Sequence, residues 1–327
     1  MNLMKTNYKE SSTGKQITKW YRAKGRNNLP WRENITPYRV WISEIMLQQT
    51  QAKTVVNYFE NFISHYPTFE DFKSASEEDV LSLWKGLGFY RRARNLYKAK
   101  EIILKKFNGK LPNSFENLIT LPGIGKSTAG AILSIAYKLP YPILDANVKR
   151  VLTRLFFKTD SNEKELWDLS SQMLDKKNVD DFQQGIMDLG ATVCTPKNAL
   201  CGECPLNKQC VSFSKGELPN VNVKKINKKN VYIEFEIYEK NKKIFLVKNN
   251  KLGFWDGLWI MPMAKTKQLK TELIHKLSHR NLHISFANKS KDELKSEGKW
   301  FDIAQLSKLP TPKPISDKLS VYVQNFL

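Results

Sequence analysis

The sequence predicts a mainly helical domain followed by a smaller α+β domain. Apolar residues recur at helical spacing through residues 15–200, and beyond residue 230 they alternate with polar residues, as they do in strands. The stretch between these regions is rich in Lys, Asn, Gly and Pro, which is typical of a linker. A chain of 327 residues is long enough for two domains, each with its own core. We therefore expect a first domain at residues 1–213, a basic linker at 214–230 and a second domain at 231–327.

The composition indicates a polyanionic partner. The formal net charge is +21 and the pI is about 9.6, which favours nucleic acid, although a lysine-rich composition can also follow from genomic bias. The N-terminus lacks the apolar core of a signal peptide, and no run approaches the roughly 18 apolar residues of a membrane helix. We expect a cytoplasmic, nucleoid-associated protein with no membrane partner.

The first expected helix that carries a candidate catalytic residue spans residues 38–51, with Thr36 as its N-cap and Pro37 in its first turn. On this helix Glu44 shares a face with three apolar side chains, those of Val40, Trp41 and Leu47. A carboxyl group desolvated there would have a raised pKa and could donate a proton near neutral pH. The alternative is a Glu at the rim of that face, with its carboxylate in water.

An aromatic and basic cluster follows a helix expected at residues 79–85. A Gly-Leu-Gly turn at residues 86–88 precedes Phe89 and Tyr90, and arginines follow at positions 91, 92 and 94. Aromatic rings beside arginines suit stacking on bases and pairing with phosphates. The same residues also suit a helix that ends at a glycine, with two core aromatics and a solvated basic face.

A glycine turn at residues 121–125, Leu-Pro-Gly-Ile-Gly, precedes a helix expected at 127–137. Glycines expose backbone N–H groups and the helix adds the positive end of its dipole, so the pair suits a phosphate. Asp145 then stands before a helix expected at 146–157 and needs another role, because a carboxylate there would not favour phosphate. Such turns also join helices, and Asp is a common N-cap. Further helices are expected at 164–175 and 179–190.

All four cysteines of the chain fall in one short loop, at the spacing C-x6-C-x2-C-x5-C. Clustered cysteines in a cytosolic protein indicate a metal centre, which could be tetrahedral zinc or a [4Fe–4S] cluster. Zinc sites usually present two short Cys-x2–4-Cys hooks and this loop has one, so we favour the iron–sulfur cluster. The expected ligands are Cys194, Cys201, Cys204 and Cys210.

In the second domain, residues 231–238 and 243–248 alternate as strands do and are expected to pair. Residues 253–263 and 282–286 extend this α+β domain.

The motifs together resemble the MutY family of adenine DNA glycosylases over nearly all of residues 20–212. The matching stretches are Leu29-Pro30-Trp31-Arg32, the run 41–51 around Glu44, the turns at 86–91 and 121–125, Pro142-Ile143-Leu144-Asp145, Asn147-Val148-Lys149-Arg150, Met187-Asp188-Leu189-Gly190 and the cysteine loop. The resemblance implies the helix-hairpin-helix glycosylase fold, with the substrate between two helical lobes and a [4Fe–4S] cluster at the cysteines.

One position separates the branches of this superfamily. Glycosylase/lyases similar to endonuclease III carry a lysine two residues after the last glycine of the turn, and its amine attacks the sugar. This chain has Ser127 there, with Lys126 one residue earlier on another side of the helix. A hydroxyl group cannot form an iminium, so the resemblance implies a monofunctional glycosylase.

The resemblance also implies roles for individual residues. Adenine would be flipped into a pocket, Glu44 would protonate the base, Asp145 would stabilise the positive charge on the sugar, and water would complete hydrolysis. The implied substrate-binding residues are Trp31, Arg32, Leu47 and Asp188 in the adenine pocket, Gln49 and Phe89 as wedges in the base stack, the amides of Gly123 to Gly125 on a phosphate, and Ser127 and Asn147.

The second domain is similar to the MutT-like (Nudix-like) module of the same family, but it lacks the glutamate-rich helix that holds metal in Nudix hydrolases. We expect lesion recognition there without nucleotide hydrolysis. Ser278 and His279 resemble the family's Phe-Ser-His motif, which touches 8-oxoguanine; an ordinary turn is the alternative. Three residues depart from the family pattern: Ala146 for glycine, Phe89 for tyrosine and Leu277 for phenylalanine.

We therefore expect a monomeric enzyme of base-excision repair that acts on double-stranded DNA containing A:8-oxoguanine or A:G mispairs. The rivals are a bifunctional glycosylase/lyase and a DNA-binding scaffold that kept the fold without the chemistry.

Overall fold

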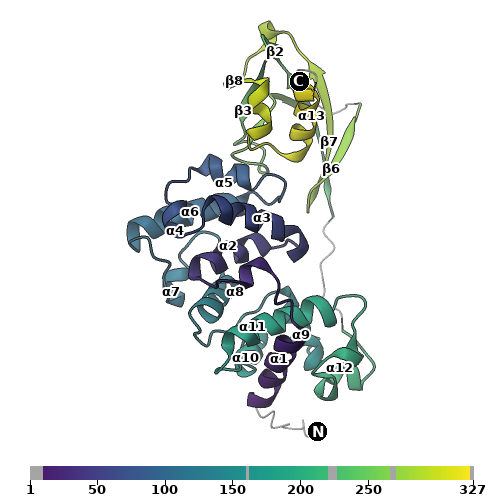
Figure 1. Cartoon of the computed structure of the whole chain (residues 1–327). Coiled ribbons are helices and arrows are strands. Elements are labelled where there is room, and N and C mark those ends of the chain that lie inside the picture. The colour runs from purple at the N-terminus through teal and green to yellow at the C-terminus, as the bar shows by residue number, and fades with distance from the viewer. Residues whose placement is uncertain (1–9, 160–161, 220–226, 266–269, 325–327) are drawn as a thin grey trace. The chain divides into compact units, whose positions relative to one another are not determined.

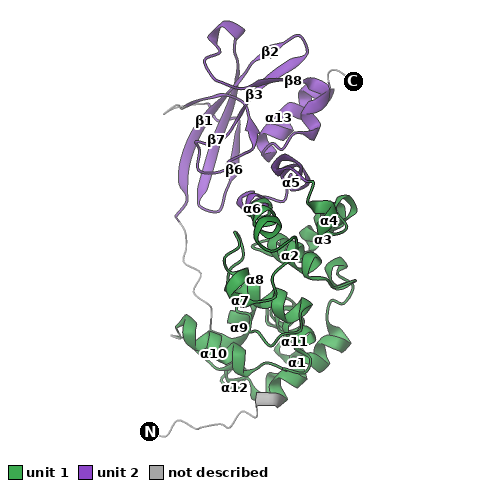
Figure 2. Ribbon diagram, turned by 90° about the vertical axis from the view of Figure 1, so that its left-hand side faces the viewer, with its two compact units in different colours: residues 1–74, 95–222 green, residues 75–94, 223–327 purple. Residues whose placement is uncertain are grey.

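The structure is a computed structural model that describes residues 10–159, 162–219, 227–265 and 270–324. The chain forms two compact units (Figure 2). The N-terminal unit comprises Met1–Ser74 and Asn95–Asn222, and the C-terminal unit comprises Ala75–Arg94 and Val223–Leu327. Among the described residues, no helix is long and apolar enough to cross a membrane.

The N-terminal unit is helical throughout its described residues (Figure 1). Its α-helices are α1 (Glu10–Lys24), α2 (Pro37–Leu47), α3 (Ala52–His65), α4 (Phe69–Phe72), most of α6 (Arg91–Lys106), α7 (Phe115–Leu118), α8 (Lys126–Ala131), α9 (Ala146–Leu155), α10 (Glu163–Gln172), α11 (Val179–Asp188) and α12 (Val211–Ser214). Two π-helical turns, η2 (Ile132–Ala136) and η3 (Leu189–Val193), continue α8 and α11, and shorter 3-10 turns are η1 (Pro30–Arg32), η4 (Cys201–Glu203) and η5 (Asn207–Gln209).

These helices form two groups. In one, α2 contacts α3, α8 and η1; in the other, α9 contacts α10, α11 and α12, and α1 packs along α11. The turn η2 contacts both α2 and α11, so it joins the groups. The core of the first group is aromatic: Tyr38 and Trp41 of α2 contact Phe69 and Phe72. Burial of such rings supplies most of the driving force for packing helices of this length.

The start of α2 is as the sequence predicts, but its end is not. Thr36 is the N-cap, its hydroxyl oxygen accepts a hydrogen bond from the amide of Arg39, and Pro37 is in the first turn. The expected helix at residues 38–51 ends instead at Leu47, because Gln49 adopts a left-handed backbone conformation (φ 58°) before α3 begins. The spacing of apolar residues cannot predict that a single residue adopts the left-handed conformation.

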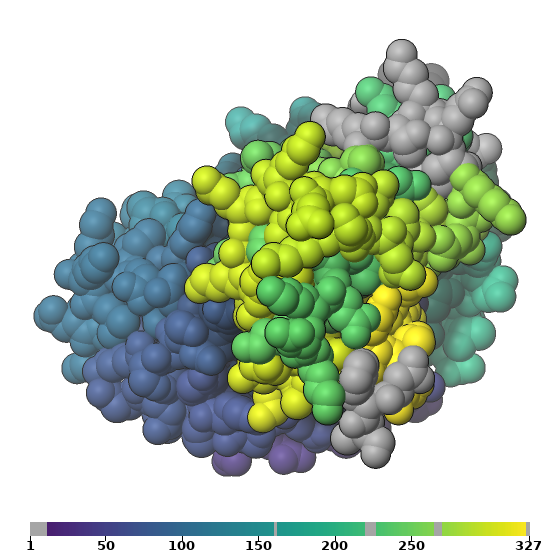
Figure 3. Space-filling view, turned by 90° about the horizontal axis from the view of Figure 1, so that it is seen from above, coloured from purple at the N-terminus to yellow at the C-terminus, as the bar shows by residue number. Residues whose placement is uncertain are grey.

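The C-terminal unit combines α5 (Glu77–Leu83) with two sheets and α13 (Lys313–Gln324). One sheet has the order β5-β1-β7-β6, formed by β5 (Met263–Lys265), β1 (Lys229–Ile237), β7 (Arg280–Asn288) and β6 (Leu273–Lys276). The other has β2 (Glu239–Lys240), β3 (Lys243–Lys248) and β4 (Trp259–Ile260) in that order, with β8 (Lys299–Asp302) also paired to β3. Figure 3 shows the surface of these C-terminal residues, coloured green to yellow.

The strands expected at residues 231–238 and 243–248 exist, but they meet only at one end, where the carbonyl of Tyr238 accepts a hydrogen bond from the amide of Phe245 (3.0 Å). β1 pairs in parallel with β7, with Ile233 opposite Ile284, whereas β3 pairs with β2, β4 and β8 in the other sheet. The alternating pattern identifies a strand and its buried face but carries no information about which strand lies beside it.

The division into units and the domain boundaries expected from sequence differ in one segment. Residues 75–94 belong to the C-terminal unit, although they lie within the first domain proposed at residues 1–213. The proposed linker at 214–230 begins as α12 ends, and its residues 220–226 lie outside the described part of the chain.

Candidate active site

Glu44 lies on α2, and its neighbours on the same helix are buried in the core. Val40 and Trp41 are buried, and Glu44 itself keeps only partial access to solvent. The pKa of Glu44 is raised to about 8, mainly by burial and also by the negative charge of Asp145, while the charge of Arg32 opposes the shift. At neutral pH this carboxyl group therefore holds its proton, as a general acid must.

Asp145 is the N-cap of α9, at the opposite group of helices. Its Oδ1 accepts a hydrogen bond from the amide of Val148 (2.7 Å), and its Oδ2 accepts one from Nδ2 of Asn147 (3.3 Å). Burial raises the pKa of Asp145, whereas these hydrogen bonds lower it. The charged form of Asp145 would raise the pKa of Glu44, so the two groups are electrostatically coupled. The two carboxyl groups therefore lie close enough to interact, in an acid and anion arrangement.

The segment that leads to Asp145 is held against α8. The hydroxyl oxygen of Ser127 accepts a hydrogen bond from the amide of Leu144 (3.0 Å). About one helical turn later Gly130 permits close contact, since a Cβ there would lie 2.2 Å from the carbonyl oxygen of Pro142. The hydroxyl of Ser127 thus fixes the backbone beside Asp145, and a contact between Ser127 and substrate stays a prediction.

The glycine turn at residues 121–125 precedes α8 and is tied to α2. Gly123 has φ 84°, which glycine adopts without strain, and the amide of Ile124 closes the turn on the carbonyl of Leu121 (3.1 Å). Gln48 donates from Nε2 to the carbonyl of Gly123 (3.0 Å), so the helix that carries Glu44 also positions the turn. A Cβ on Gly125 would meet nothing within 4 Å, so the described chain itself leaves this approach open.

Arg32 and Asp188 form a buried ion pair. Asp188 is 0% exposed and accepts hydrogen bonds from both terminal nitrogens of Arg32 (2.7 and 2.9 Å) as well as from Arg26. Although burial favours the neutral acid, the hydrogen bonds and charges of Arg32 and Arg26 hold the pKa of Asp188 below its usual value. Asp188 thus contacts arginines and no open cavity, and it fixes Arg32, whose charge reaches Glu44.

Trp31, the aromatic residue expected in the adenine pocket, is 7% exposed and packs edge-on against Phe59 (5.7 Å between ring centroids). Leu47, at the end of α2, is partly exposed. Of the expected pocket residues, Arg32 is the one whose charge the structure links directly to Glu44.

A chain of hydrogen bonds connects Asp145 with the cysteine loop. Asn147 donates to Asp145 and accepts from Nη2 of Arg150 (2.8 Å), and Nε of Arg150 donates to the carbonyl of Cys194 (2.7 Å). Arg150 also donates to the carbonyl of Gly190 (2.6 Å), where a Cβ would lie 2.6 Å from Cβ of Asn147. The sequence motifs contained Arg150 and Gly190, but their partners were not apparent from them.

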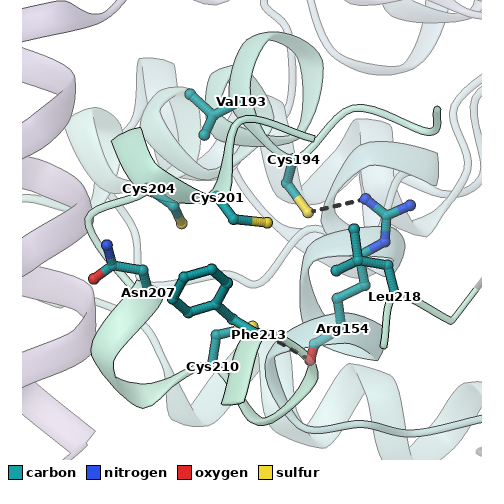
Figure 4. A pocket seen from close by; sticks show the side chains of 9 residues that line it. All are labelled: Arg154, Val193, Cys194, Cys201, Cys204, Asn207, Cys210, Phe213 and Leu218. Carbon is teal, nitrogen blue, oxygen red and sulfur yellow. Dashed lines mark hydrogen bonds between the residues drawn. The ribbon is translucent and has the colours of Figure 1, made fainter. Parts of the chain in front are cut away.

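The four cysteines face one hollow of about 310 Å³ (Figure 4). They are free thiols, and η4 and η5 bring them together through short turns in which the amide of Cys204 bonds to the carbonyl of Cys201 and that of Cys210 to Asn207. Arg154 enters the same hollow and its Nη1 lies 3.5 Å from Sγ of Cys194. Among the described residues, no three His, Cys, Asp or Glu side chains are arranged to hold a single metal ion. Four convergent sulfurs beside a cation are nevertheless a donor set that fits an anionic iron–sulfur cluster.

The remaining expected contacts lie at exposed turns. Gln49 follows α2 in the N-terminal unit and is exposed. In the C-terminal unit, Phe89 is 44% exposed with φ 51°, and Arg92 lies over its ring at 5.2 Å. Ser278 and His279 are exposed in the turn between β6 and β7.

Known proteins similar to this chain share both its sequence and its helical fold. Residues 42–174 match the HhH-GPD superfamily of base excision DNA repair proteins. The adenine DNA glycosylase of Buchnera aphidicola subsp. Schizaphis graminum is 38% identical over 340 residues, covering 94% of this chain and 97% of its own length. The human adenine DNA glycosylase is 41% identical over 208 residues, covering 59% of this chain and 38% of its own.

Among solved structures, a thermostable thymine-DNA glycosylase superimposes with a TM-score of 0.59 at 29% identity, covering 64% of this chain and 99% of that one. An endonuclease III in a non-covalent complex with DNA gives a TM-score of 0.54 at 23% identity, covering 62% of this chain and 94% of that one. At that identity the second comparison shows a shared fold.

Proposed function

The chain belongs to the adenine DNA glycosylase (MutY) family of helix-hairpin-helix glycosylases, and we propose that it removes adenine mispaired with 8-oxoguanine or guanine. It is an N-glycosylase of base-excision repair. The observation that carries the proposed mechanism is the pair of carboxyl groups: Glu44, with a pKa raised to about 8, is electrostatically coupled to Asp145, which accepts hydrogen bonds from Val148 and Asn147.

In the proposed reaction, the adenine nucleotide leaves the base stack and Glu44 protonates the base, which makes it a better leaving group. Positive charge then develops on the sugar as the glycosidic bond breaks, and the carboxylate of Asp145 stabilises it. Water adds to the sugar and completes hydrolysis. The hydrogen bonds from Val148 and Asn147 keep Asp145 in one orientation throughout.

Substrate contacts would come from several segments of the chain. Arg32 and Leu47, with the buried Trp31 and Asp188 behind them, would shape the adenine pocket. The amides of Gly123 and Gly125 would approach a phosphate, since that of Ile124 already closes the turn. The exposed Gln49 and Phe89 would enter the base stack, and Ser278 and His279 would contact the base opposite adenine.

The reaction would stop at base removal. Ser127 occupies the position of the lyase lysine, and its hydroxyl oxygen is bound to the amide of Leu144. Lys126 precedes that position by one residue and is exposed at the start of α8. No amine in that position is therefore available to form a Schiff base.

Cys194, Cys201, Cys204 and Cys210 would hold a [4Fe–4S] cluster. When bound, such a cluster would fix the loop through iron–thiolate bonds and present a redox-active centre. Arg150 and Arg154 link this loop to α9, and hence to Asp145, through their hydrogen bonds. We propose that the enzyme acts as a monomer on double-stranded DNA in the cytoplasm, associated with the nucleoid.

The direct test uses duplexes that contain one A:8-oxoguanine, A:G or A:T pair. Wild-type protein should release free adenine from the two mispairs and leave the strand intact until alkali or heat is applied. Strand breaks that form without such treatment would indicate a glycosylase/lyase. Binding of the mispairs with no released adenine would indicate a scaffold.

A further inference from the structure

Residues 75–94 belong to the C-terminal unit, although residues 42–174 match one glycosylase superfamily. This segment comprises α5, the Gly86–Gly88 turn and the exposed Phe89. The same unit contains the β6–β7 turn with Ser278 and His279. The C-terminal unit therefore contains both Phe89, which is proposed to enter the base stack, and the turn with Ser278 and His279, which is proposed to contact the base opposite adenine (Figure 2).

Specific side-chain contacts fasten α5 to the C-terminal strands. Nε1 of Trp259, at the start of β4, donates a hydrogen bond to Oε1 of Glu78 (2.7 Å), and Trp259 is 6% exposed. A hydrogen bond to a charged acceptor is stronger than one between neutral groups, and this one is shielded from water by the indole ring. The ring itself packs edge-on against Phe301 of β8 (4.8 Å between centroids).

Further contacts lie on both sides of this hydrogen bond. Ser82 donates to the carbonyl of Lys308 (3.3 Å), and Lys85 donates from Nζ to the carbonyl of Ser307 (3.0 Å). At the start of α6, Arg94 reaches Asp256 (3.4 Å), an ion pair that is partly exposed and therefore weak by itself. Gly257 fits beside Arg94, because a Cβ there would lie 3.3 Å from Cδ of Arg94.

We propose that the Glu78–Trp259 contact couples recognition of the opposite base to the Phe89 turn, so that it determines the preference for 8-oxoguanine. This inference rests on the proposed function. Contacts between the β6–β7 turn and a lesion favour one position of the C-terminal unit as a whole. Phe89 follows that position only while the Glu78–Trp259 hydrogen bond holds α5 to β4. Without the fastening, lesion contacts still form but no longer favour distortion of the duplex at the adenine.

The test compares substitutions at one position. Glu78→Met removes the acceptor at similar length, Glu78→Gln keeps a carbonyl oxygen that can accept from Trp259, and Trp259→Phe removes the donor while keeping a ring against Phe301. Glu77→Met is the matched control, because it removes a carboxylate from the same first turn of α5. Single-turnover release of adenine is measured on A:8-oxoguanine and A:G duplexes with enzyme in excess.

Glu78→Met and Trp259→Phe should lower the ratio of the A:8-oxoguanine rate to the A:G rate by at least about fivefold, the lower end of usual coupling between sites. Glu77→Met should keep the wild-type ratio, and Glu78→Gln, whose neutral oxygen accepts a weaker hydrogen bond, should lie between wild type and Glu78→Met. Hydrogen exchange of amides in residues 84–90 should be fastest in Glu78→Met among the Glu variants and unchanged in Glu77→Met.

Equal loss of both rates in Glu78→Met would show a purely structural contact and overturn the inference, as would an unchanged ratio. A wild-type protein that releases adenine from both mispairs without preferring 8-oxoguanine would also overturn it, with the proposed activity intact. A wild-type protein that releases no adenine would overturn the proposed function first.

Discussion

The proposed reaction needs Glu44 and Asp145 in opposite protonation states at the same pH, and the two groups have different surroundings. Glu44 sits among apolar side chains of α2, where burial raises its pKa to about 8. Asp145 receives two hydrogen bonds at the head of α9, which oppose the effect of burial. An acid and an anion at one glycosidic bond are the minimum that the proposed hydrolysis requires.

The rate of adenine release should therefore depend on pH through Glu44. The acid form of Glu44 is the reactive one, so the single-turnover rate should fall about tenfold per pH unit above about pH 8. At low pH the rate should fall as well, because Asp145, whose pKa burial raises, takes up a proton there. Since its folded-state pKa is raised, Glu44 also contributes stability that is complete below the ordinary carboxyl range and lost as the pH rises through about 8. A rate that is constant from pH 7 to about pH 9.5 at saturating enzyme would contradict the assignment of Glu44 as the acid.

Local sequence predicted the environment of Glu44 better than that of Arg32. The apolar neighbours of Glu44 are three or four residues away on one helix, so periodicity alone predicted its desolvation. Arg32 pairs with Asp188, which is 156 residues distant, and Ser127 binds the amide of Leu144. No local pattern indicates such partners, so the sequence alone did not predict these two contacts.

At the scale of elements, α9 connects the proposed chemistry to the cysteine loop. Its N-cap is Asp145, and one turn later Arg150 reaches Asn147, the carbonyl of Gly190 and the carbonyl of Cys194. The guanidinium group thus spans three segments that would otherwise be held together by apolar packing.

Arg150→Met should keep the length of this side chain and lose its hydrogen bonds. Hydrogen bonds from a charged donor contribute about 1.5–3 kcal/mol each. The free energy of unfolding of the variant should therefore be lower than that of wild type by at least about 2 kcal/mol. We expect adenine release to fall about tenfold or more and iron content, measured per polypeptide, to fall with it. Lys149→Met, on the same helix, is the control. Full iron content and wild-type adenine release in Arg150→Met would show that the connection has no effect.

Most helices could be predicted from the sequence, but their ends and the strand pairing could not. Thr36 and Pro37 marked the start of α2 because capping is a local interaction. The left-handed conformation of Gln49 that ends the helix region, and the pairing of β1 with β7, depend on contacts with distant segments. Tertiary structure decides such features.

At the scale of the whole molecule, the net charge of +21 should make DNA binding strongly dependent on salt. Each phosphate contact releases counterions, so the logarithm of the affinity should fall linearly with the logarithm of salt concentration. Lys126→Gln, beside the proposed phosphate seat at Gly125, should reduce the steepness of that line by about one, whereas Lys164→Gln should leave it unchanged. Titration of a fluorescent mispaired duplex at several salt concentrations measures both slopes; equal slopes would place the phosphate elsewhere.

The central claim is that Glu44 and Asp145 act together on one extruded adenine nucleotide. Its most direct test is adenine release from an A:8-oxoguanine duplex under single turnover, with binding measured in parallel, for wild type, Glu44→Gln and Asp145→Asn. We expect both variants to bind the duplex about as well as wild type and to release adenine more than about a thousandfold more slowly, since each lacks one of the two required groups. Release at close to the wild-type rate by either variant would contradict the account.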